Sequence, residues 1–481
     1  MEKLNQNVVQ PVRQLLSDKA WARWTALALV ASMMLFAYMF VDVMSPLQSL
    51  IQTQRGWSPD AFGYYAGAEY ILNVFGFLIL AGIILDKMGV RFTGTLSASL
   101  MVLGAFIKLY GISEAFQGTA LDQWLSSWWT AMPGSAKLAA LGFMIFGCGC
   151  EMAGITVSKT LAKWFEGKEM ALAMGLEMAI ARVGVFFIFT ISPRLADWST
   201  PPSVVIPVAF CAALLCIGLL CFIVFTFMDS KLDKEMGASK VSEAASDEEF
   251  KLSDVGAIFG SKLFWIIAML CVLYYSAIFP FQRYAANMLQ CNLGISETQA
   301  SDIFRWFPIG AAVLTPFLGY FLDRKGKGAS MLILGAILMI VCHLTFAFVV
   351  PTTQSKLITY SAIVVLGVSF SLVPAALWPS VPKIMDKRFL GSAYSLIFWV
   401  QNIGLAFVPI IIGKVITWSN PGITDPLQYN YTVPMCCFAS LGVLALIFGI
   451  ILKSMNAIHH YGLEDPNIKE DFDDVRLDGE A

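Results

Sequence analysis

Long apolar runs alternate with short polar segments along nearly the whole chain. Each run has about 21 to 28 residues, which is the length an α-helix needs to cross a bilayer core of roughly 30 Å. The pattern therefore predicts an all-α membrane protein with twelve transmembrane helices. We expect them near residues 24–50, 61–85, 92–112, 135–161, 170–192, 204–228, 263–289, 301–322, 329–350, 357–382, 389–416 and 432–454.

One polar stretch, Asp229–Asp254, interrupts this pattern and divides the runs six and six. It is rich in charge and Ser, which is typical of a flexible linker. We therefore predict two six-helix bundles, 24–228 and 263–454, joined by a cytoplasmic linker at 229–262. Residues 1–23 form a polar N-terminal tail, and 455–481 an acidic, disordered C-terminal tail.

Composition supports the membrane class. The chain of 481 residues is 57% hydrophobic and only 14% charged, with a mean hydropathy of +0.69, too little charge to cover a soluble surface. No basic patch indicates nucleic acid, and no phosphate loop, nucleophile elbow or zinc helix indicates an enzyme. The ten cysteines lie in or beside apolar runs, so we interpret them as buried thiols and expect neither metal nor cofactor.

Lys and Arg set the expected orientation. Lys87 and Arg91, Lys163 and Lys168, and Lys383 to Arg388 fall on one side, whereas the other side carries scattered basic residues. The positive-inside rule then places both termini in the cytoplasm.

Two runs carry an ionisable residue at membrane depth, Glu151 in the fourth and Arg182 in the fifth. Each lies about twelve or thirteen residues from the charged turn between these runs, so both are expected roughly 18–20 Å from that membrane face. A charge at this depth is costly and normally faces a partner or a ligand. One acid and one base in a common cavity suit a zwitterionic solute, although an ion pair that locks the two helices would use the same residues.

An internal repeat relates the two halves. Gly82-Ile-Ile-Leu-Asp86-Lys-Met-Gly89-Val-Arg91 recurs as Gly319-Tyr-Phe-Leu-Asp323-Arg324-Lys-Gly326, each after the second run of its half. Lys163–Gly184 also aligns without a gap on Lys383–Gly404, which sets Glu151 opposite Ser371 and Arg182 opposite Asn402. The C-terminal half lacks both charges there, and we expect it to supply Trp378, Gln401 and Asn402 to a solute.

The repeated loop resembles the signature loop of the major facilitator superfamily. Asp86, Arg91, Asp323 and Arg324 are then expected to form gates whose cytoplasmic contacts break and re-form, favouring the outward-facing state. This implies two pseudo-symmetric bundles that work by alternating access around a midplane site.

Further motifs resemble the lysosomal dipeptide-uniporter branch of that superfamily. They are Gly-x-Gly-x-Glu151, Trp164-Phe-x-Gly167-Lys168-Glu169, Gly175-Leu176, Met-Ala-x-Ala-Arg182-x-Gly184, Phe279-Pro280-Phe281, Ala376-Leu377-Trp378-Pro379, Gln401-Asn402-x-Gly404, and Asp42 with Leu47-Gln48. The resemblance implies that Glu151 takes the amino end of a short peptide and Arg182 the carboxyl end. Trp378, Gln401, Asn402 and Asp42 then complete the substrate site.

The chain departs from that branch at three places. Glu177 stands where the resemblance implies a neutral glutamine, and Glu69 is an additional acid; either could couple transport to protons. Leu15-Leu16 lacks the preceding acidic residue of a lysosomal sorting signal, which favours a bacterial inner membrane over the lysosomal alternative.

Two other functions stay open: a proton-coupled carrier of another small organic anion or sugar acid, and a membrane receptor or scaffold that does not transport. The expected partners are a small-molecule substrate and the lipid bilayer, and an accessory subunit is left open. Lys108 and Lys159 are expected to be interfacial or to snorkel towards the interface.

Overall fold

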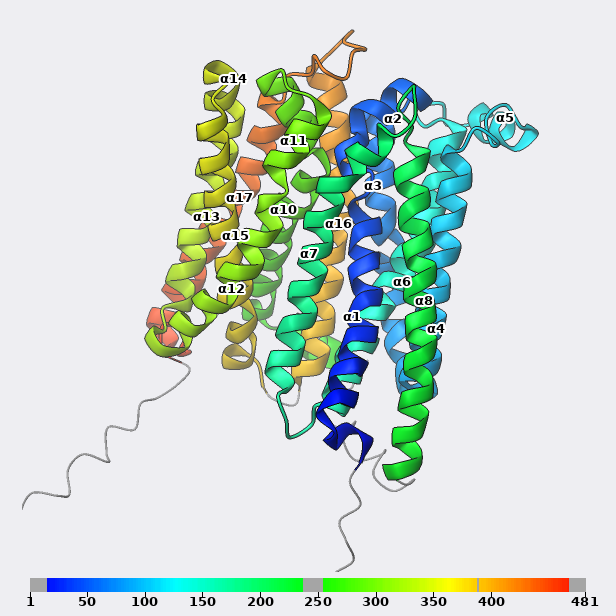
Figure 1. The fold of residues 1–481 in the computed structure, drawn as a ribbon. Helices are drawn as coiled ribbons and strands as arrows, with labels where there is room; N and C mark the ends of the chain where they lie inside the picture. Colours follow the sequence, from blue (N-terminus) through cyan, green and yellow to red (C-terminus); the bar gives the residue numbers. More distant parts are fainter. Residues whose placement is uncertain (1–14, 237–253, 387–388, 467–481) are drawn as a thin grey trace, which may run out of the picture.

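The computed structural model describes residues 15–236, 254–386 and 389–466, and these form a bundle of helices that run roughly parallel to one another (Figure 1). No strand occurs among the described residues. The all-α membrane fold expected from the apolar runs is thereby confirmed.

The N-terminal half begins with η1 (Leu16–Asp18) and contains α1 to α8. Their bounds are α1 (Ala20–Asp42), η2 (Ser45–Leu47), α2 (Gln48–Arg55), α3 (Pro59–Val74), α4 (Phe77–Ile112), α5 (Ala120–Ser127), α6 (Gly134–Trp164), α7 (Met170–Ala196) and α8 (Val205–Met236).

The C-terminal half contains α9 to α17. Their bounds are α9 (Val255–Phe259), α10 (Lys262–Leu293), α11 (Glu297–Phe304), α12 (Trp306–Lys325), α13 (Gly328–Leu344), the π-helix η4 (Thr345–Val349), α14 (Val350–Thr353), α15 (Lys356–Ile384), α16 (Leu390–Ser419) and α17 (Thr432–His459).

Within the described residues, eleven helical stretches are long and apolar enough to cross a membrane, one fewer than expected. The difference lies in the second expected span, 61–85. The chain bends at Gly76 (φ 97°), so α3 ends at Val74 and the rest of this span opens α4. α4 then passes through Gly89 (φ 75°, ψ 171°), which is not helical, into the third span. Positive φ is cheap only for glycine, and both bends use one.

The helices end later than the polar pattern suggested. α8 continues through Asp229, which was expected to open the linker. Asp229 is fully buried, and hydrogen bonds from Lys163 Nζ (2.8 Å) and Trp164 Nε1 (2.9 Å) compensate its carboxylate for the loss of water. A polar residue can thus belong to a helix end that other side chains neutralise. Residues 237–253 of the expected linker lie outside the described residues.

The C-terminal tail also begins later than expected. α17 runs to His459, and the next residues turn back onto the bundle, burying Leu463 at 1% exposure. Its backbone amide donates to Asn456 Oδ1 at 3.0 Å. The expected disorder is therefore wrong for 455–466, and residues 467–481 lie outside the described part.

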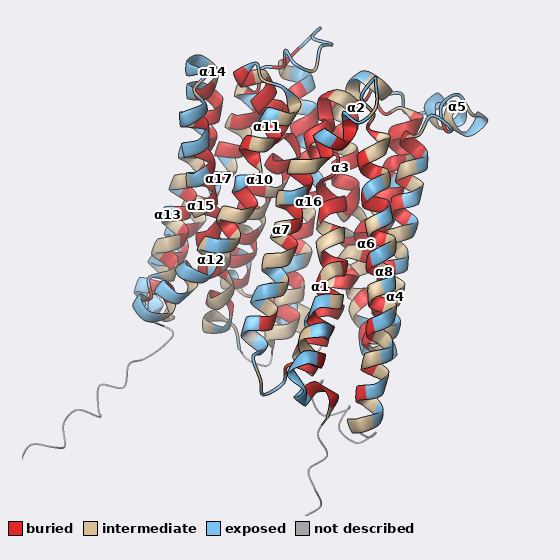
Figure 2. Cartoon of the chain, viewed as in Figure 1, coloured by how far each residue is buried: buried red, intermediate tan, exposed pale blue. Residues whose placement is uncertain are grey.

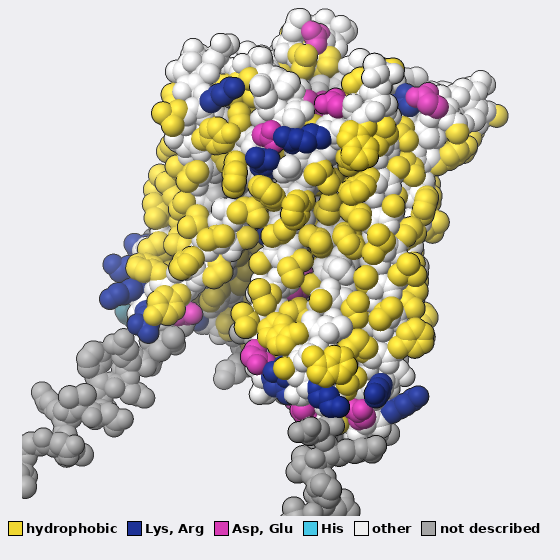
Figure 3. Space-filling view, viewed as in Figure 1, with side chains coloured by type: hydrophobic (Ala, Val, Ile, Leu, Met, Phe, Trp, Pro, Cys, Tyr) yellow, Lys and Arg dark blue, Asp and Glu magenta, His cyan; other side chains and the backbone are white. Residues whose placement is uncertain are grey.

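Burial follows the demands of a bilayer. Buried positions lie between helices and exposed positions on the outer surface (Figure 2), where large apolar side chains such as Phe75, Phe227, Phe317 and Leu357 are 70–80% exposed. Apolar side chains dominate the middle of the surface, and Lys and Arg gather towards its two ends (Figure 3). An apolar belt between charged ends is what a lipid environment requires, so the chain is a multi-pass membrane protein.

The halves meet where α3 packs on α16, where α7 packs on α12 and α11, and where α10 packs on η2 and α2. The first pair approaches closely because it uses glycine. A Cβ atom on Gly63 would lie 2.6 Å from the Pro409 carbonyl oxygen, and one on Gly67 would collide with the Ala406 carbonyl. We call the side with α2, α5 and α14 the outer side, and the opposite side, where α1 begins and α17 ends, the inner side (Figure 1).

Candidate functional site

Arg182 on α7 lies among aromatic rings contributed by both halves. Its guanidinium carbon is 5.2 Å from the ring centre of Phe279 on α10, 5.6 Å from Phe370 on α15 and 5.9 Å from Tyr38 on α1. Aromatic faces attract a cation but do not neutralise it. Among the described residues, no ion pair within 4.0 Å involves Arg182. The structure therefore leaves this cation available to an anionic group.

Glu151 on α6 is likewise without an ion pair in the described part of the chain. The alternative of a locking pair between Glu151 and Arg182 is not observed. The two charges nevertheless belong to one region, because both lie within electrostatic reach of the Tyr38 hydroxyl, as does Glu177. Acidic and basic groups thus lie in the neighbourhood of Tyr38 without forming an ion pair with each other among the described residues.

Trp378 on α15 extends this region into the C-terminal half. Its Nε1 donates to the Tyr275 hydroxyl at 3.2 Å, and the Tyr275 ring stacks on Phe279 with centres 5.6 Å apart. Trp378 also stacks on Phe398, with ring centres 4.8 Å apart. A continuous aromatic row therefore runs from Trp378 to the rings around Arg182.

Gln401 and Asn402 both lie on α16 and are buried. Gln401 Oε1 accepts a hydrogen bond from Cys271 Sγ at 3.2 Å. Asn402 Nδ2 donates to the Phe398 carbonyl at 3.0 Å, one turn earlier, and its Oδ1 is buried without a partner among the described atoms. Their roles at a solute stay predictions.

A second charged cluster was missed by the sequence analysis. Arg283 on α10 donates from Nη2 to Glu69 Oε2 at 2.5 Å and from Nη1 to Asp42 Oδ1 at 3.2 Å; it also donates to the Val41 carbonyl. Asp42 and Glu69 lie in the N-terminal half, so Arg283 joins the halves. The signal that could have found it is the one that found Arg182, a lone base in an apolar run.

Lys108 on α4 is fully buried, so its expected interfacial position is wrong. Its Nζ lies 4.1 Å from the ring centre of Phe40, 4.7 Å from Phe143 and 5.1 Å from Tyr65, and has no hydrogen-bond partner among the described atoms. α4 and α6 pack closely, because a Cβ on Gly104 of α4 would collide with the backbone of α6. That packing turns Lys108 into the bundle, where aromatic faces surround its charge.

The expected gate residues lie at the inner side. Asp86 pairs with Lys159 Nζ at 2.6 Å, and Arg91 with Asp233 at 3.1 Å; both pairs stay within the N-terminal half. Arg324 lies over the Tyr320 ring at 4.8 Å, and Asp323 is within electrostatic reach of Lys383. Their gating role is not tested by these contacts.

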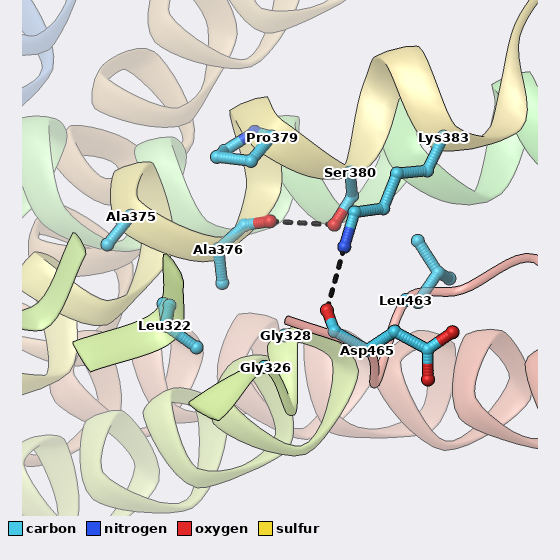
Figure 4. Close-up of a pocket in the computed structure, with 10 residues that line it drawn as sticks. All are labelled: Leu322, Gly326, Gly328, Ala375, Ala376, Pro379, Ser380, Lys383, Leu463 and Asp465. Carbon is cyan, nitrogen blue, oxygen red and sulfur yellow. Dashed lines mark hydrogen bonds between the residues drawn. The ribbon is translucent and has the colours of Figure 1, made fainter. Parts of the chain in front are cut away.

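The C-terminal segment holds the loop that follows Asp323. The Lys327 amide donates to the Glu464 carbonyl at 2.9 Å, and the Gly328 amide to the Leu463 carbonyl at 3.0 Å. A recess forms where this segment meets α15, and Lys383 Nζ reaches across it to the Asp465 carbonyl at 3.1 Å (Figure 4). The recess lies away from Arg182 and belongs to the inner surface of the C-terminal half.

The outer side carries polar contacts between the halves. Ser49 Oγ donates to Glu297 at 2.9 Å, Gln52 Nε2 to the Tyr429 hydroxyl at 2.6 Å, and Arg194 Nη2 to Asp302 at 2.8 Å. On the inner side, by contrast, the surface is hollowed between the halves (Figure 3). The halves are thus joined on the outer side and separated towards the inner side.

The comparisons with known proteins agree with this architecture. The family model described as Major Facilitator Superfamily matches residues 27–409 and 284–457. The lysosomal dipeptide transporter MFSD1 of Danio rerio is 29% identical over 397 residues, covering 79% of this chain and 77% of the relative. The Homo sapiens protein of the same name is 26% identical over 368 residues, covering 74% and 70%.

Solved structures with the same fold come from several transporters. A bacterial homologue of the human lysosomal transporter Spinster, in an inward-facing and occupied conformation, matches with a TM-score of 0.67 at 13% identity, covering 90% of this chain and 97% of that one. A D-xylose–proton symporter matches with a TM-score of 0.67 at 14% identity and the same coverage. At these identities the likeness shows the fold alone.

Proposed function

Because the chain belongs to the Major Facilitator Superfamily, we propose that it carries short peptides, above all dipeptides, across its membrane by alternating access. Membership makes it a membrane transporter of small molecules rather than an enzyme. The relatives named as dipeptide transporters support the substrate class, and the chemistry around Arg182 supports it independently.

The observation that carries the proposal is the contrast between two arginines at membrane depth, Arg182 and Arg283. Arg283 is neutralised by two carboxylates, whereas Arg182 lies among aromatic rings and has no carboxylate within 4.0 Å in the described part of the chain. A cation at membrane depth costs at least about 2.5–3.5 kcal/mol on insertion scales unless something neutralises it. A bound carboxylate would do so, and a guanidinium can hold one by two parallel hydrogen bonds.

Glu151 completes the clamp. Its carboxylate would accept hydrogen bonds from the ammonium end of the same solute, since it too lacks an ion-pair partner in the described part and lies within electrostatic reach of the same Tyr38 hydroxyl as Arg182. Charges fixed at two ends select the length of a solute more than its side chains. Trp378 and the aromatic row behind it would pack against those side chains.

The arrangement of the halves supports alternating access. Rings from both halves surround Arg182, so a solute held there would touch both. With the predicted orientation, contacts at the outer side and a hollow at the inner side correspond to a state open to the cytoplasm. Rocking the halves about the α3–α16 and α7–α12 interfaces would open the other side.

Thermal stabilisation of the purified protein tests the substrate class. A ligand bound only by the folded state adds about 2.7 kcal/mol at a hundredfold excess over Kd. We expect stabilisation by dipeptides, and none by the same dipeptides acetylated at the amino end or amidated at the carboxyl end. Arg182→Gln should abolish the shift, and Arg194→Gln, which alters an outer-surface arginine, should preserve it.

A small organic anion is the competing substrate, because Arg182 alone could hold it. Glu151→Gln separates the two classes: it should remove stabilisation by dipeptides and leave stabilisation by simple carboxylates intact. Stabilisation of the unmodified protein by carboxylates but by no dipeptide would overturn the dipeptide assignment.

A further inference from the structure

Asp42, Glu69 and Arg283 form a compact charged triad assembled from three helices. Asp42 ends α1, Glu69 lies in α3, and Arg283 lies in α10 of the other half. Their side chains are 2%, 4% and 8% exposed. Two carboxylates share one guanidinium, so the triad with all three groups ionised carries one negative charge.

The two carboxylates are not equivalent. Asp42 accepts hydrogen bonds from Gln282 Nε2 at 2.6 Å and Ser45 Oγ at 3.0 Å in addition to Arg283. Among the described residues, Arg283 is the one side chain that donates a hydrogen bond to Glu69. Donors stabilise a carboxylate in its charged form. If α10 withdraws, Gln282 and Arg283 leave together; Asp42 then keeps the Ser45 hydroxyl of its own half as a donor, whereas Glu69 is left without a side-chain donor among the described residues.

Opening the outer side would draw Arg283 away. It lies ten residues before the outer end of α10, roughly 15 Å along the helix, and the contacts between Ser49 and Glu297 lie further outwards. The triad therefore lies deeper in the bundle than the Ser49–Glu297 contact that closes the outer side. Because α10 belongs to the other half than α1 and α3, alternating access must part these helices on that side.

We propose that the triad is a proton site, at which a proton from the outer solution replaces Arg283 on Glu69. One O–H bond forms on the Glu69 carboxylate as its contact with Arg283 Nη2 breaks; the guanidinium keeps its own protons. This inference rests on the alternating access proposed above. It adds that protonation of Glu69 from the outer solution breaks a contact that holds the two halves together on the outer side.

The charged and titratable groups around Glu69 come from every element packed against it. They are Asp42 on α1, Tyr65 and Tyr70 on α3, Lys108 on α4, Cys150 and Glu151 on α6, and Arg283 on α10. Arg283 and Lys108 both lie over the Phe143 ring, at 5.6 and 4.7 Å. Lys108 is held by rings on α1, α3 and α6 within its own half, so it would stay when Arg283 leaves.

The triad is also connected to the candidate substrate site. A small cavity between α3, α10 and α16 is lined by Tyr70, Phe279 and Arg283, and the Phe279 ring faces Arg182. Phe279 and Arg283 are one helical turn apart on α10. A shift of α10 would therefore move Phe279, a ring of the candidate substrate site, together with Arg283, whose ion pairs hold the two halves together.

The test uses the full chain reconstituted in lipid vesicles, with dipeptide uptake measured between about pH 5 and about pH 8 outside. We expect uptake to rise as the outer pH falls. Glu69→Gln, which mimics the protonated acid, should lose this dependence. Asp302→Asn, the same change in an exposed pair between the halves, should retain it. A Glu69→Gln variant with the pH profile of the unmodified protein would overturn the proposal.

Hydrogen–deuterium exchange separates this inference from the substrate assignment, because it needs no substrate. With rates corrected for intrinsic chemistry, residues 48–58 and 284–294 on the outer side should exchange faster in Glu69→Gln than in the unmodified protein. Uptake that is absent for every dipeptide would refute the proposed function. Equal exchange in the two proteins would refute the proton site.

Discussion

Replacing Arg182 and Arg283 by leucine should have opposite effects on stability. The substitution is the same and both residues lie at membrane depth, but their surroundings differ. Arg283 is bonded to two buried carboxylates, and removing one partner from a buried ion pair costs about 3–5 kcal/mol because the other charge is left behind. Arg283→Leu strands Asp42 and Glu69, so we expect a loss at the upper end of that range.

Arg182→Leu leaves no ion-pair partner without its counter-charge among the described residues. Arg182 has three aromatic neighbours and no ion pair within 4.0 Å in the described part of the chain, and removing an unneutralised charge relieves a cost of at least about 2.5–3.5 kcal/mol. The lost cation–π contacts, worth about 0.5–2 kcal/mol, offset part of this gain. We expect the ligand-free protein to be as stable as the original or more so, with ligand binding abolished.

The free energy of unfolding in mixed detergent micelles measures both effects. Arg194→Leu serves as a surface control, because its pair with Asp302 is 45% and 28% exposed and such pairs contribute about 0–1 kcal/mol. Adding Asp42→Asn and Glu69→Gln to Arg283→Leu should restore most of the loss. If Arg283→Leu is no less stable than Arg194→Leu, the inferred energetic role of the triad is incorrect.

Three further results are expected. Asp229→Asn should lower the free energy of unfolding by about 1–3 kcal/mol, measured by the same titration, since this buried carboxylate receives two hydrogen bonds; an unchanged value would contradict its structural role. The hydrogen bond from Lys168 holds the pKa of Asp18 below its ordinary value. The stabilisation by this bond is therefore present above the ordinary pKa of Asp18 and is lost as the pH falls through the lowered pKa. After correction for intrinsic rates, amide exchange in η1 should be faster in acid, and corrected exchange that does not respond would count against this reasoning. Glu464→Ala removes both carboxylate bonds to Ser330 and should speed exchange across residues 326–331, whereas Asp465→Ala, at a position whose backbone carbonyl makes the bond in Figure 4, should not.

Much of the architecture could be predicted from the sequence because a bilayer imposes a simple rule. Backbone groups in lipid must be satisfied within the helix, so every crossing needs a long apolar run. This condition leaves few alternatives to the twelve expected spans. The repeated loops at Asp86 and Asp323 occur at the same place in each half and therefore indicate that the two halves are repeats of one another. Arg182 and Glu151 could be identified for the same reason, as isolated charges where charge is costly.

The tertiary structure decided what each charge contacts. Arg283 bonds Asp42 and Glu69 across more than 200 positions of the chain, a pairing that no local pattern contains. Lys108 was assigned to the interface from its depth, but the close packing of α4 on α6 turned it inwards. Distance along a helix determines depth, whereas the direction in which a side chain points depends on which helices pack around it. The sequence by itself therefore determined at what depth the charges lie in the membrane. Only the packing of the expected spans into two halves decided which charges are paired and which, such as Arg182 and Glu151, have no ion-pair partner among the described residues.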